Sequence, residues 1–527
     1  MGHGHPERPY VSRREFLKRT AYVGAAAAAG PWFWRQLAYA DDAPARQLHL
    51  NFGADASRDA VISFMTDASV KHPFAELGGR RWTAETAQYP GYPGYFHHVH
   101  VHGLNPAKAY AYRVGHSNKL LSPRHVHRTG PSGRARFTFT AFGDQGVDGP
   151  QAGLPPVSQP PVQASANVEL ANSFKPAMHL IVGDLAYANG DQAIWDKWFD
   201  MIEPMAANIP WMPCIGNHEI ETQVESIAGA PSDSWGTWGY DPYRTRFALP
   251  ENGSSKFENC FYTFRYGSVQ FVSVDNNDIN EEIAPNKGYT GGGQRRWFEK
   301  QLAAAHASPD VDFIVVLMHQ CAFSSSSKHG SDPGVFGTWA PLFAKYSVDL
   351  VFQGHDHVYE RTHAMRRSDI MSAQAPYKTD VGTVYVTCGN GGAVQEPFMP
   401  LQPAWSAFRQ DFKIGTVRVD VDPAAPNGMQ RLTLGEYWAL DGSAIEEGIV
   451  LEKPRKRTDT KVASAGADAD ADSEQRLAAS APEPGMAMPV TGGRGAATLI
   501  GTATAAGAAG ARLYANRERR TKSPRNS

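Results

Sequence analysis

The chain has 527 residues, 42% of them apolar and 20% charged, which is ordinary globular composition with room for two or three domains. Its 51 basic and 53 acidic residues leave a net charge of −2, which argues against nucleic acid as a partner. Four cysteines are too few for a disulfide framework, although an exported protein could hold one bridge. Cys214 and Cys388 lie in apolar, strand-like runs, which predicts buried core thiols.

The N-terminus has the pattern of an export signal. Arg13 and Arg14 precede an alanine- and glycine-rich run that ends in Ala38-Tyr39-Ala40. A twin arginine, a weakly apolar stretch and an A-x-A ending are typical of a Tat signal peptide. We expect the Tat translocase to export the folded protein and residues 1–40 to be removed, which gives a secreted protein.

Short strands with period-two alternation follow, between residues 45 and 130. The alternating segments are 48–52, 60–64, 98–101 and 110–114. Several short strands at this spacing predict a small β-sandwich.

A histidine cluster lies in the third of these segments, at positions 97, 98, 100 and 102. His98, His100 and His102 would share one face of the strand, and the sequence places no acidic residue beside them. We therefore predict a structural role for the cluster rather than a metal site.

From residue 134 to 453, apolar β-prone runs alternate with helical stretches, which is typical of a layered α/β domain. Residues 194–201 and 294–305 have the periodicity of amphipathic helices. Two long loops, 146–166 and 221–243, have no periodicity and are typical of functional rims.

Five apolar runs in this region end in a glycine or methionine followed by polar residues. The segments are Gly143-Asp144-Gln145-Gly146, Gly183-Asp184, Gly216-Asn217-His218-Glu219, Met318-His319 and Gly354-His355-Asp356-His357. A buried strand that ends in a tight turn presents a polar side chain at the edge of its sheet. Five such strand ends at one edge would form a metal cage.

These segments, together with Tyr187 and the sequence Val358-Tyr359-Glu360-Arg361, resemble the purple acid phosphatase family over residues 47–453. The resemblance implies a fibronectin type III-like β-sandwich over residues 45–130. It also implies a calcineurin-like α/β metallophosphoesterase domain over residues 134–453, a β-sandwich flanked by helices. Most other metallophosphoesterases begin with Asp-x-His, whereas here Gln145-Gly146 replaces that histidine and Tyr187 appears downstream.

The resemblance implies two metal positions that share Asp184. The first would be held by Asp144, Asp184, Tyr187 and His357, and the second by Asp184, Asn217, His319 and His355. Two carboxylates and a phenolate favour a hard trivalent ion, so we expect Fe(III) at the first position. Two imidazoles, an amide oxygen and a shared carboxylate suit a divalent ion at the second position, namely Zn, Mn or Fe(II).

The expected activity is hydrolysis of phosphate monoesters by a hydroxide that the two ions activate. The resemblance implies that the catalytic residues His218 and His329 contact the substrate. Lys328 stands where plant members often have another histidine, and its charge could hold phosphate.

Four further residues near these segments are expected to support the site. We expect Glu219 and Glu360 to orient ligand histidines, Arg361 to hold these carboxylates, and Asp356 to stabilise a turn.

Two other functions stay open at this stage. A phosphodiesterase or nucleotide hydrolase would use the same dimetal core. A non-catalytic binding protein displayed on the wall would be expected to have lost a metal ligand, whereas all seven positions carry competent residues.

The C-terminal region, residues 454–527, has low complexity and is predicted to be a disordered linker with a sorting signal. Met488-Pro489-Val490-Thr491-Gly492, an uncharged run and several arginines resemble a Gram-positive sortase signal, usually Leu-Pro-x-Thr-Gly. Cleavage by sortase after Thr491 would attach the protein to the cell wall. A weak tail anchor and a plain disordered end are the alternatives.

Overall fold

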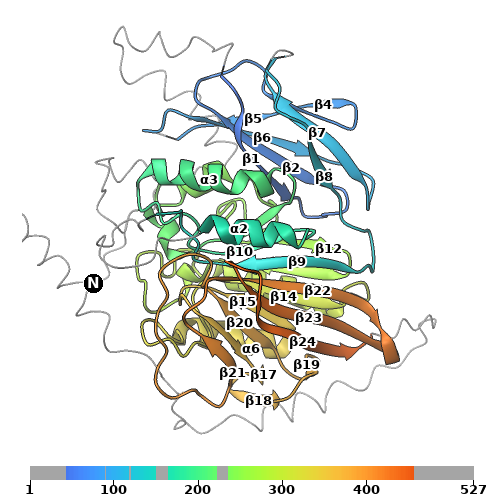
Figure 1. The fold of residues 1–527 in the computed structure, drawn as a ribbon, viewed down its shortest axis with the longest axis vertical. Coiled ribbons are helices and arrows are strands. Elements are labelled where there is room, and N and C mark those ends of the chain that lie inside the picture. The colour runs from blue at the N-terminus through green and yellow to red at the C-terminus, as the bar shows by residue number, and fades with distance from the viewer. Residues whose placement is uncertain (1–42, 90, 118–119, 150–163, 222–235, 456–527) are drawn as a thin grey trace, which may run out of the picture.

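The computed structural model describes residues 43–89, 91–117, 120–149, 164–221 and 236–455 (Figure 1). The predicted signal peptide, most of the C-terminal linker and the middle of both long loops lie outside the described residues. Among the described residues, no helix combines the length and apolarity needed to cross a membrane.

The N-terminal β-sandwich consists, in its described residues, of two antiparallel four-stranded sheets, coloured blue in Figure 1. One sheet has the order β1(Arg46–Phe52), β2(Ala60–Thr66), β6(Tyr95–Val101), β5(Glu85–Ala87). The other has the order β4(Arg80–Thr83), β3(Phe74–Leu77), β7(Ala109–Gly115), β8(His125–Arg128). Alternate residues such as Leu50 and Ile62 pack against Leu77 and Val114 in the core between the sheets, which confirms the predicted sandwich.

The catalytic region contains two larger sheets, each seven-stranded over the described residues. The first has the order β11(Trp211–Cys214), β10(His179–Val182), β9(Phe137–Phe142), β22(Gly415–Ala425), β23(Met429–Trp438), β24(Ala444–Pro454), β19(Tyr377–Lys378). The second has the order β12(Tyr262–Tyr266), β13(Val269–Ser273), β14(Phe313–Leu317), β15(Leu350–Gln353), β20(Val384–Cys388), β16(Tyr359–Thr362), β21(Ser406–Gln410). A short ribbon pairs β17(Ala364–Arg366) with β18(Asp369–Ser372).

The two large sheets pack face to face and helices cover their outer faces. Phe139 of the first sheet contacts Phe271 and Phe352 of the second at ring-centroid distances of 5.4 and 6.1 Å. The described residues include the helices α2(Ala164–Ser173), α3(Gln192–Ala206), α4(Asp241–Arg246), α5(Gly293–Ala307) and α6(Pro333–Tyr346), with single turns η2(Asn217–Glu219), η5(Asn276–Asp278) and η6(Pro426–Gly428). Helices α3 and α5 contain the two predicted amphipathic segments, and the predicted fold class is confirmed.

Parallel pairing explains where the site forms. Strands β9, β10 and β11 are parallel neighbours in the first sheet, and β13, β14, β15 and β20 are parallel neighbours in the second. Because parallel strands end at the same edge, their carboxyl ends bring all five predicted segments to one side of the packed sheets.

The β1-β2-β6 sheet uses its outer face to bind the catalytic region. In Figure 1, α3 lies between β1 and the sheet that contains β9 and β10. Asn51 donates to the Trp211 carbonyl at 2.5 Å, and His98 Nε2 donates to the Thr245 carbonyl at 2.9 Å. The contacts of His98 support the predicted structural role of the histidine cluster.

Two details of the sequence interpretation change. His102 does have an acidic partner, because its Nδ1 lies 3.3 Å from Asp59 Oδ1 at the exposed end of the strand. All four cysteines are buried free thiols, so the single disulfide that an exported protein could hold is not formed.

Candidate metal centre

The two predicted aspartate ligands occupy strained turns at the ends of adjacent strands. Asp144 follows β9 and Asp184 follows β10, with φ angles of 55° and 50°, in the left-handed region that non-glycine residues rarely adopt. The turns support each other, because the backbone N–H of Asp144 donates to the Gly183 carbonyl at 3.1 Å. A Cβ at Gly216 would collide with the Asp184 carboxylate, and one at Gly354 would collide with the Asp144 carboxylate. These glycines therefore let the backbone approach the carboxylates.

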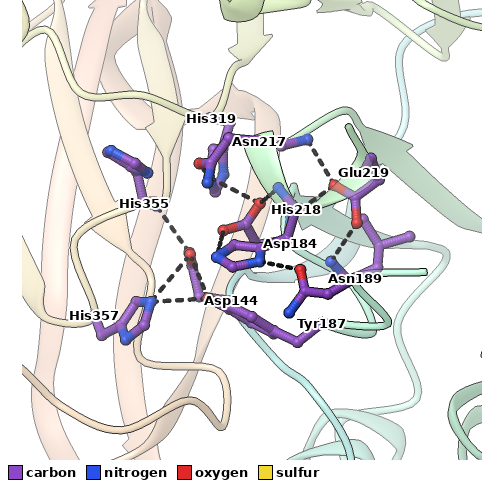
Figure 2. Close-up of polar contacts among 12 residues, drawn as sticks. Asp144, Asp184, Tyr187, Asn189, Asn217, His218, Glu219, His319, His355 and His357 are labelled. Carbon is purple, nitrogen blue, oxygen red and sulfur yellow. Dashed lines mark hydrogen bonds and ion pairs between the residues drawn. The ribbon is translucent and has the colours of Figure 1, made fainter. Parts of the chain in front are cut away.

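Asp144, Tyr187 and His357 form the first group of converging side chains (Figure 2). Tyr187 Oη lies 3.1 Å from Asp144 Oδ1 and 2.8 Å from His357 Nε2. His357 Nε2 lies 3.6 Å from the same Asp144 oxygen. His357 Nδ1 donates to the Val394 carbonyl at 2.7 Å, which directs the Nε2 lone pair toward this group.

Asp184, Asn217, His319 and His355 form the second group. His319 Nε2 lies 3.1 Å from Asn217 Oδ1 and 3.2 Å from Asp184 Oδ1. One ligand atom from each of Asp184, His319 and His355 lies within 4.8 Å of the others. Figure 2 shows Asp184 between this group and Asp144. The structure thus brings together all seven predicted ligands.

The donor atoms in both groups fit metal ions. His319 Nδ1 donates to the Val182 carbonyl at 2.8 Å, so Nε2 faces Asn217 Oδ1 and Asp184 Oδ1 and would offer its lone pair to a cation in place of the proton it otherwise shares with these oxygens. In the first group, one phenol proton faces two acceptors, Asp144 and His357. Such a convergence of acceptors in a buried site is favourable when a cation lies between them.

Without metal ions, the pKa values of these side chains reflect the convergence. Burial and the neighbouring Asp184 carboxylate hold the pKa of Asp144 well above its ordinary value, and burial with the Asp144 carboxylate does the same for the pKa of Tyr187. Burial alone would lower the pKa of His319, but the carboxylates of Asp184 and Asp144 raise it to about 10. The raised pKa of His319 thus reports negative charge at the place where metal ions would bind.

Both predicted catalytic histidines lie beside the two groups. The backbone N–H of His218 donates to Asp184 Oδ1 at 2.8 Å, and its Nδ1 lies 2.6 Å from Asn189 Oδ1. His329 Nδ1 lies 2.5 Å from Glu282 Oε1, and its ring centroid lies 4.1 Å from that of His355. Burial lowers the pKa of His218. Burial also opposes the charged form of His329, but the hydrogen bond to Glu282 and the carboxylates of Asp356, Glu282 and Glu396 together raise its pKa.

The expected roles of Glu219, Glu360 and Arg361 are wrong. Glu219 accepts from the backbone N–H groups of Asp184, Leu185 and Gly216 at 2.7–2.9 Å, so it fixes the ligand-bearing turns and not a histidine ring. Glu360 accepts from the backbone N–H and hydroxyl of Ser325.

Arg361 pairs with Glu446 at 2.7 Å and holds neither Glu219 nor Glu360. Asp356 does stabilise a turn, but that of a neighbouring loop, because Oδ1 accepts from the N–H groups of His329 and Gly330.

Several site residues were missed by the sequence interpretation. Glu282 and Glu396 reach the site from loops that carry no local signal. Glu396 lies 3.4 Å from His357 Nδ1 and 2.5 Å from Lys328 Nζ. A sixth strand end, Gly389-Asn390-Gly391-Gly392 after β20, follows the rule used for the other five and was overlooked. Its Gly391 N–H donates to the Gly143 carbonyl at 3.0 Å, next to Asp144.

Comparison with known proteins agrees with this geometry. The chain matches the calcineurin-like phosphoesterase family over residues 137–359 and the purple acid phosphatase N-terminal domain over residues 45–129. A Mycobacterium tuberculosis protein described as uncharacterized is 33% identical, covering 84% of this chain and 96% of the relative. A purple acid phosphatase of Glycine max is 26% identical, covering 69% of this chain and 77% of the relative.

The fold also has a counterpart among solved structures. Purple acid phosphatase PPD1 from yellow lupin superposes with a TM-score of 0.63 at 22% identity, covering 78% of this chain and 74% of the lupin chain. The fold and the strand-end donors define a metallophosphoesterase. Within that class, the chain belongs to the purple acid phosphatase family of dimetal enzymes, and it is a phosphoric monoester hydrolase.

Proposed function

We infer that the protein is an exported acid phosphatase with an Fe(III) ion and a divalent Zn, Mn or Fe ion. The observation that carries this proposal is the position of the Tyr187 phenol, 3.1 Å from Asp144 Oδ1 and 2.8 Å from His357 Nε2. A phenolate, carboxylate and imidazole set is hard and anionic, which suits a trivalent ion.

Each predicted metal position has its own residues. Asp144, Tyr187 and His357 would hold Fe(III), and Asn217, His319 and His355 would hold the divalent ion, with Asp184 shared. When bound, the two ions would orient the phosphate, supply an activated hydroxide and neutralise charge on the phosphoryl oxygens.

The histidines would act on the substrate. Nδ1 of His218 donates to Asn189 Oδ1 and Nε2 lies 3.8 Å from Asp184 Oδ2, so this ring would contact the substrate beside the shared carboxylate. Nδ1 of His329 is held by Glu282, which leaves Nε2 as the atom that gives a proton to the departing alcohol. The Lys328 ammonium group, with 55% of its side chain exposed, would add positive charge near the substrate.

Export by the Tat translocase rests on Arg13-Arg14 and Ala38-Tyr39-Ala40, and attachment to a Gram-positive cell wall rests on the sortase-like segment 488–492. Mass spectrometry of the protein released from the wall would test both. The expected product begins near Asp41 and ends at Thr491 linked to a wall fragment, and a protein with intact ends would contradict the proposal.

Metal analysis and a visible spectrum of the purified protein test the dimetal centre. We expect two metals per chain, one of them iron, and a visible tyrosinate-to-Fe(III) band. Two metals without that band would remove the Fe(III)–tyrosinate assignment. Kinetics on a phosphate monoester and a diester side by side should favour the monoester.

A further inference from the structure

We propose that Glu282 is a positioning residue that fixes a metal-ligand histidine and a substrate-contacting histidine with one carboxylate. The proposal rests on the proposed function, because it assigns Glu282 a role toward the second metal position and toward the leaving group. No strand-end motif contains this residue, which follows η5 in the connection between the neighbouring strands β13 and β14.

The carboxylate bridges two imidazole rings. Glu282 Oε1 lies 2.5 Å from His329 Nδ1, and Oε2 lies 3.0 Å from His355 Nε2. The two rings pack with centroids 4.1 Å apart and planes inclined by 35°. The side chains of His355 and Glu282 are 4% and 25% exposed, so the bridge lies at the inner border of the site. Each carboxylate oxygen thus receives one ring N–H.

The backbone on both sides of the bridge is anchored. Asp332 Oδ2 accepts from the N–H groups of Glu281 and Glu282 at 2.8 and 3.2 Å. The other Asp332 oxygen caps α6 by accepting from Val335 N–H at 2.9 Å. Asp356 accepts from the backbone N–H of His329, on the opposite side. Asp332 at the start of α6 and Asp356 beside the ligand histidines therefore fix the backbone that carries Glu282 and His329.

For His355, the bridge selects the nitrogen that can bind a metal. When Nε2–H donates to Glu282, the lone pair lies on Nδ1. His355 belongs to the cluster with Asp184 and His319, whose ligand atoms lie within 4.8 Å of one another. A carboxylate on the distal ring nitrogen fixes the tautomer and the ring plane, and residues in this role typically change metal affinity or activity by about 10–100-fold.

For His329, the same carboxylate selects the nitrogen that exchanges protons. Nδ1–H donates to Glu282, so Nε2 is the atom that can transfer a proton to a leaving oxygen. The arrangement couples leaving-group protonation to the geometry of the divalent metal position. A merely structural Glu282 would affect neither property selectively.

Glu282→Gln is the informative variant, because an amide oxygen can accept from only one of the two rings. Glu282→Asp keeps the charge with a shorter reach, and Glu281→Gln removes the same charge from the exposed neighbouring residue as a matched control. We would measure divalent-metal affinity with Zn²⁺, and kcat and KM at saturating Zn²⁺ on nitrophenyl phosphate and glycerol phosphate. Nitrophenolate departs without a proton, whereas the glycerol alkoxide needs one.

Glu282→Gln should weaken Zn²⁺ binding about 10–100-fold. At saturating Zn²⁺ it should lower kcat on glycerol phosphate at least about tenfold while changing kcat on nitrophenyl phosphate little. Glu282→Asp should restore part of both losses, and Glu281→Gln should match the unmodified protein.

Unchanged Zn²⁺ affinity together with equal losses on the two substrates would overturn the proposal. So would a third metal per chain that Glu282→Gln loses, because the three groups would then bind an ion rather than each other. Retention of the Tyr187-dependent visible band reports that the variants fold. Failure of the proposed function would instead appear in the unmodified protein, as the absence of two metals or of monoester hydrolysis.

Discussion

Two groups of histidines in this molecule contrast in their partners. In the N-terminal sandwich, His97 lies between the hydroxyls of Thr66 and Thr86, each at 2.9 Å. In the catalytic region, His319 and His357 direct Nε2 toward carboxylate, amide and phenol oxygens. The histidines are buried in both regions, so burial alone does not distinguish a ligand from a structural residue.

The pKa of His319 expresses the same contrast, whereas burial lowers the pKa of His357 to about 3, as it does for His97. Burial lowers the pKa of His97 to about 3, because no carboxylate offsets the loss of hydration. His319 is equally buried, yet Asp184 and Asp144 raise its pKa to about 10. Histidines are therefore candidate ligands where strand ends bring carboxylates to them, and a run of histidines along one strand is a weak indicator.

Asp184→Ala is the substitution with the largest expected effect, because it removes the carboxylate shared by the two predicted metal positions. We expect both metals to be lost and kcat to fall by at least about 10³-fold, since the ions supply several kcal/mol of transition-state stabilisation. Metal analysis and phosphatase assays measure both effects. Asp191→Ala, which removes the N-cap of α3, is a control that should lose only stability. Two metals retained in Asp184→Ala would refute the shared ligand.

Tyr187→Phe tests the first group with a smaller effect. The visible band should disappear because the phenolate is its source, while kcat should fall by no more than about 100-fold because the carboxylates and imidazoles remain. Absorption spectra and steady-state kinetics provide the comparison. Tyr359→Phe is a matched control, because the buried Tyr359 phenol donates a 3.0 Å hydrogen bond to Glu446 and is not one of the predicted ligands. An unchanged spectrum in Tyr187→Phe would exclude it as the chromophore.

The structural histidines should make the protein less stable in acid. The folded pKa of His97 is about 3 and the unfolded value is about 6.5, so the unfolded chain binds more protons between these values. Stability is therefore fully present above about pH 6.5 and is lost as the pH falls, by about 2 kcal/mol at pH 5 for this residue.

Urea unfolding of the unmodified protein and His97→Gln at pH 7.5 and pH 5 isolates that contribution. The variant should be less stable at pH 7.5, because it loses hydrogen bonds to two threonines, and the difference should shrink at pH 5. A difference independent of pH would mean that His97 does not remain neutral in the folded protein.

Sequence reasoning succeeded where a ligand is contiguous with the strand that presents it. Asp144, Asp184 and Asn217 each follow an apolar run directly, so a local rule finds both the strand and the ligand. The same rule applied to residues 384–392 would have found the sixth strand end. The sandwich was also predictable, because alternation of apolar residues is a local property of a strand.

The roles of side chains that act on a distant part of the backbone could not be predicted from the sequence. Glu219 follows His218 in sequence, which suggested a partner ring, but η2 turns its carboxylate back onto the N–H groups of Gly216 and Asp184. Glu282 and Glu396 approach the site through loops whose course depends on the packing of α6 and the second sheet. Their positions are set by tertiary contacts that no short pattern contains.

The smallest predicted effect concerns Lys328, which forms an ion pair with Glu396 and stands where plant members of the family often have a histidine. Lys328 Nζ lies 2.5 Å from the buried Glu396 carboxylate. Lys328→His would extend the catalytic histidine group and replace a permanent charge with one that is lost above about pH 6.5. Because exposed ion pairs contribute about 0.2–1 kcal/mol, KM for a phosphate monoester should rise up to about fivefold.

The rise in KM for Lys328→His should depend on pH. This dependence distinguishes the loss of positive charge from the change in side-chain shape. At pH 5 the introduced imidazole is protonated and KM should match the unmodified protein, whereas at pH 7.5 the ring is neutral and KM should increase. Lys328→Met, which keeps the length of the chain without charge, should raise KM equally at both values. Identical KM values for all three proteins across this range would show that the ammonium group serves only Glu396, and that substrate phosphate is held by the histidines and metals alone.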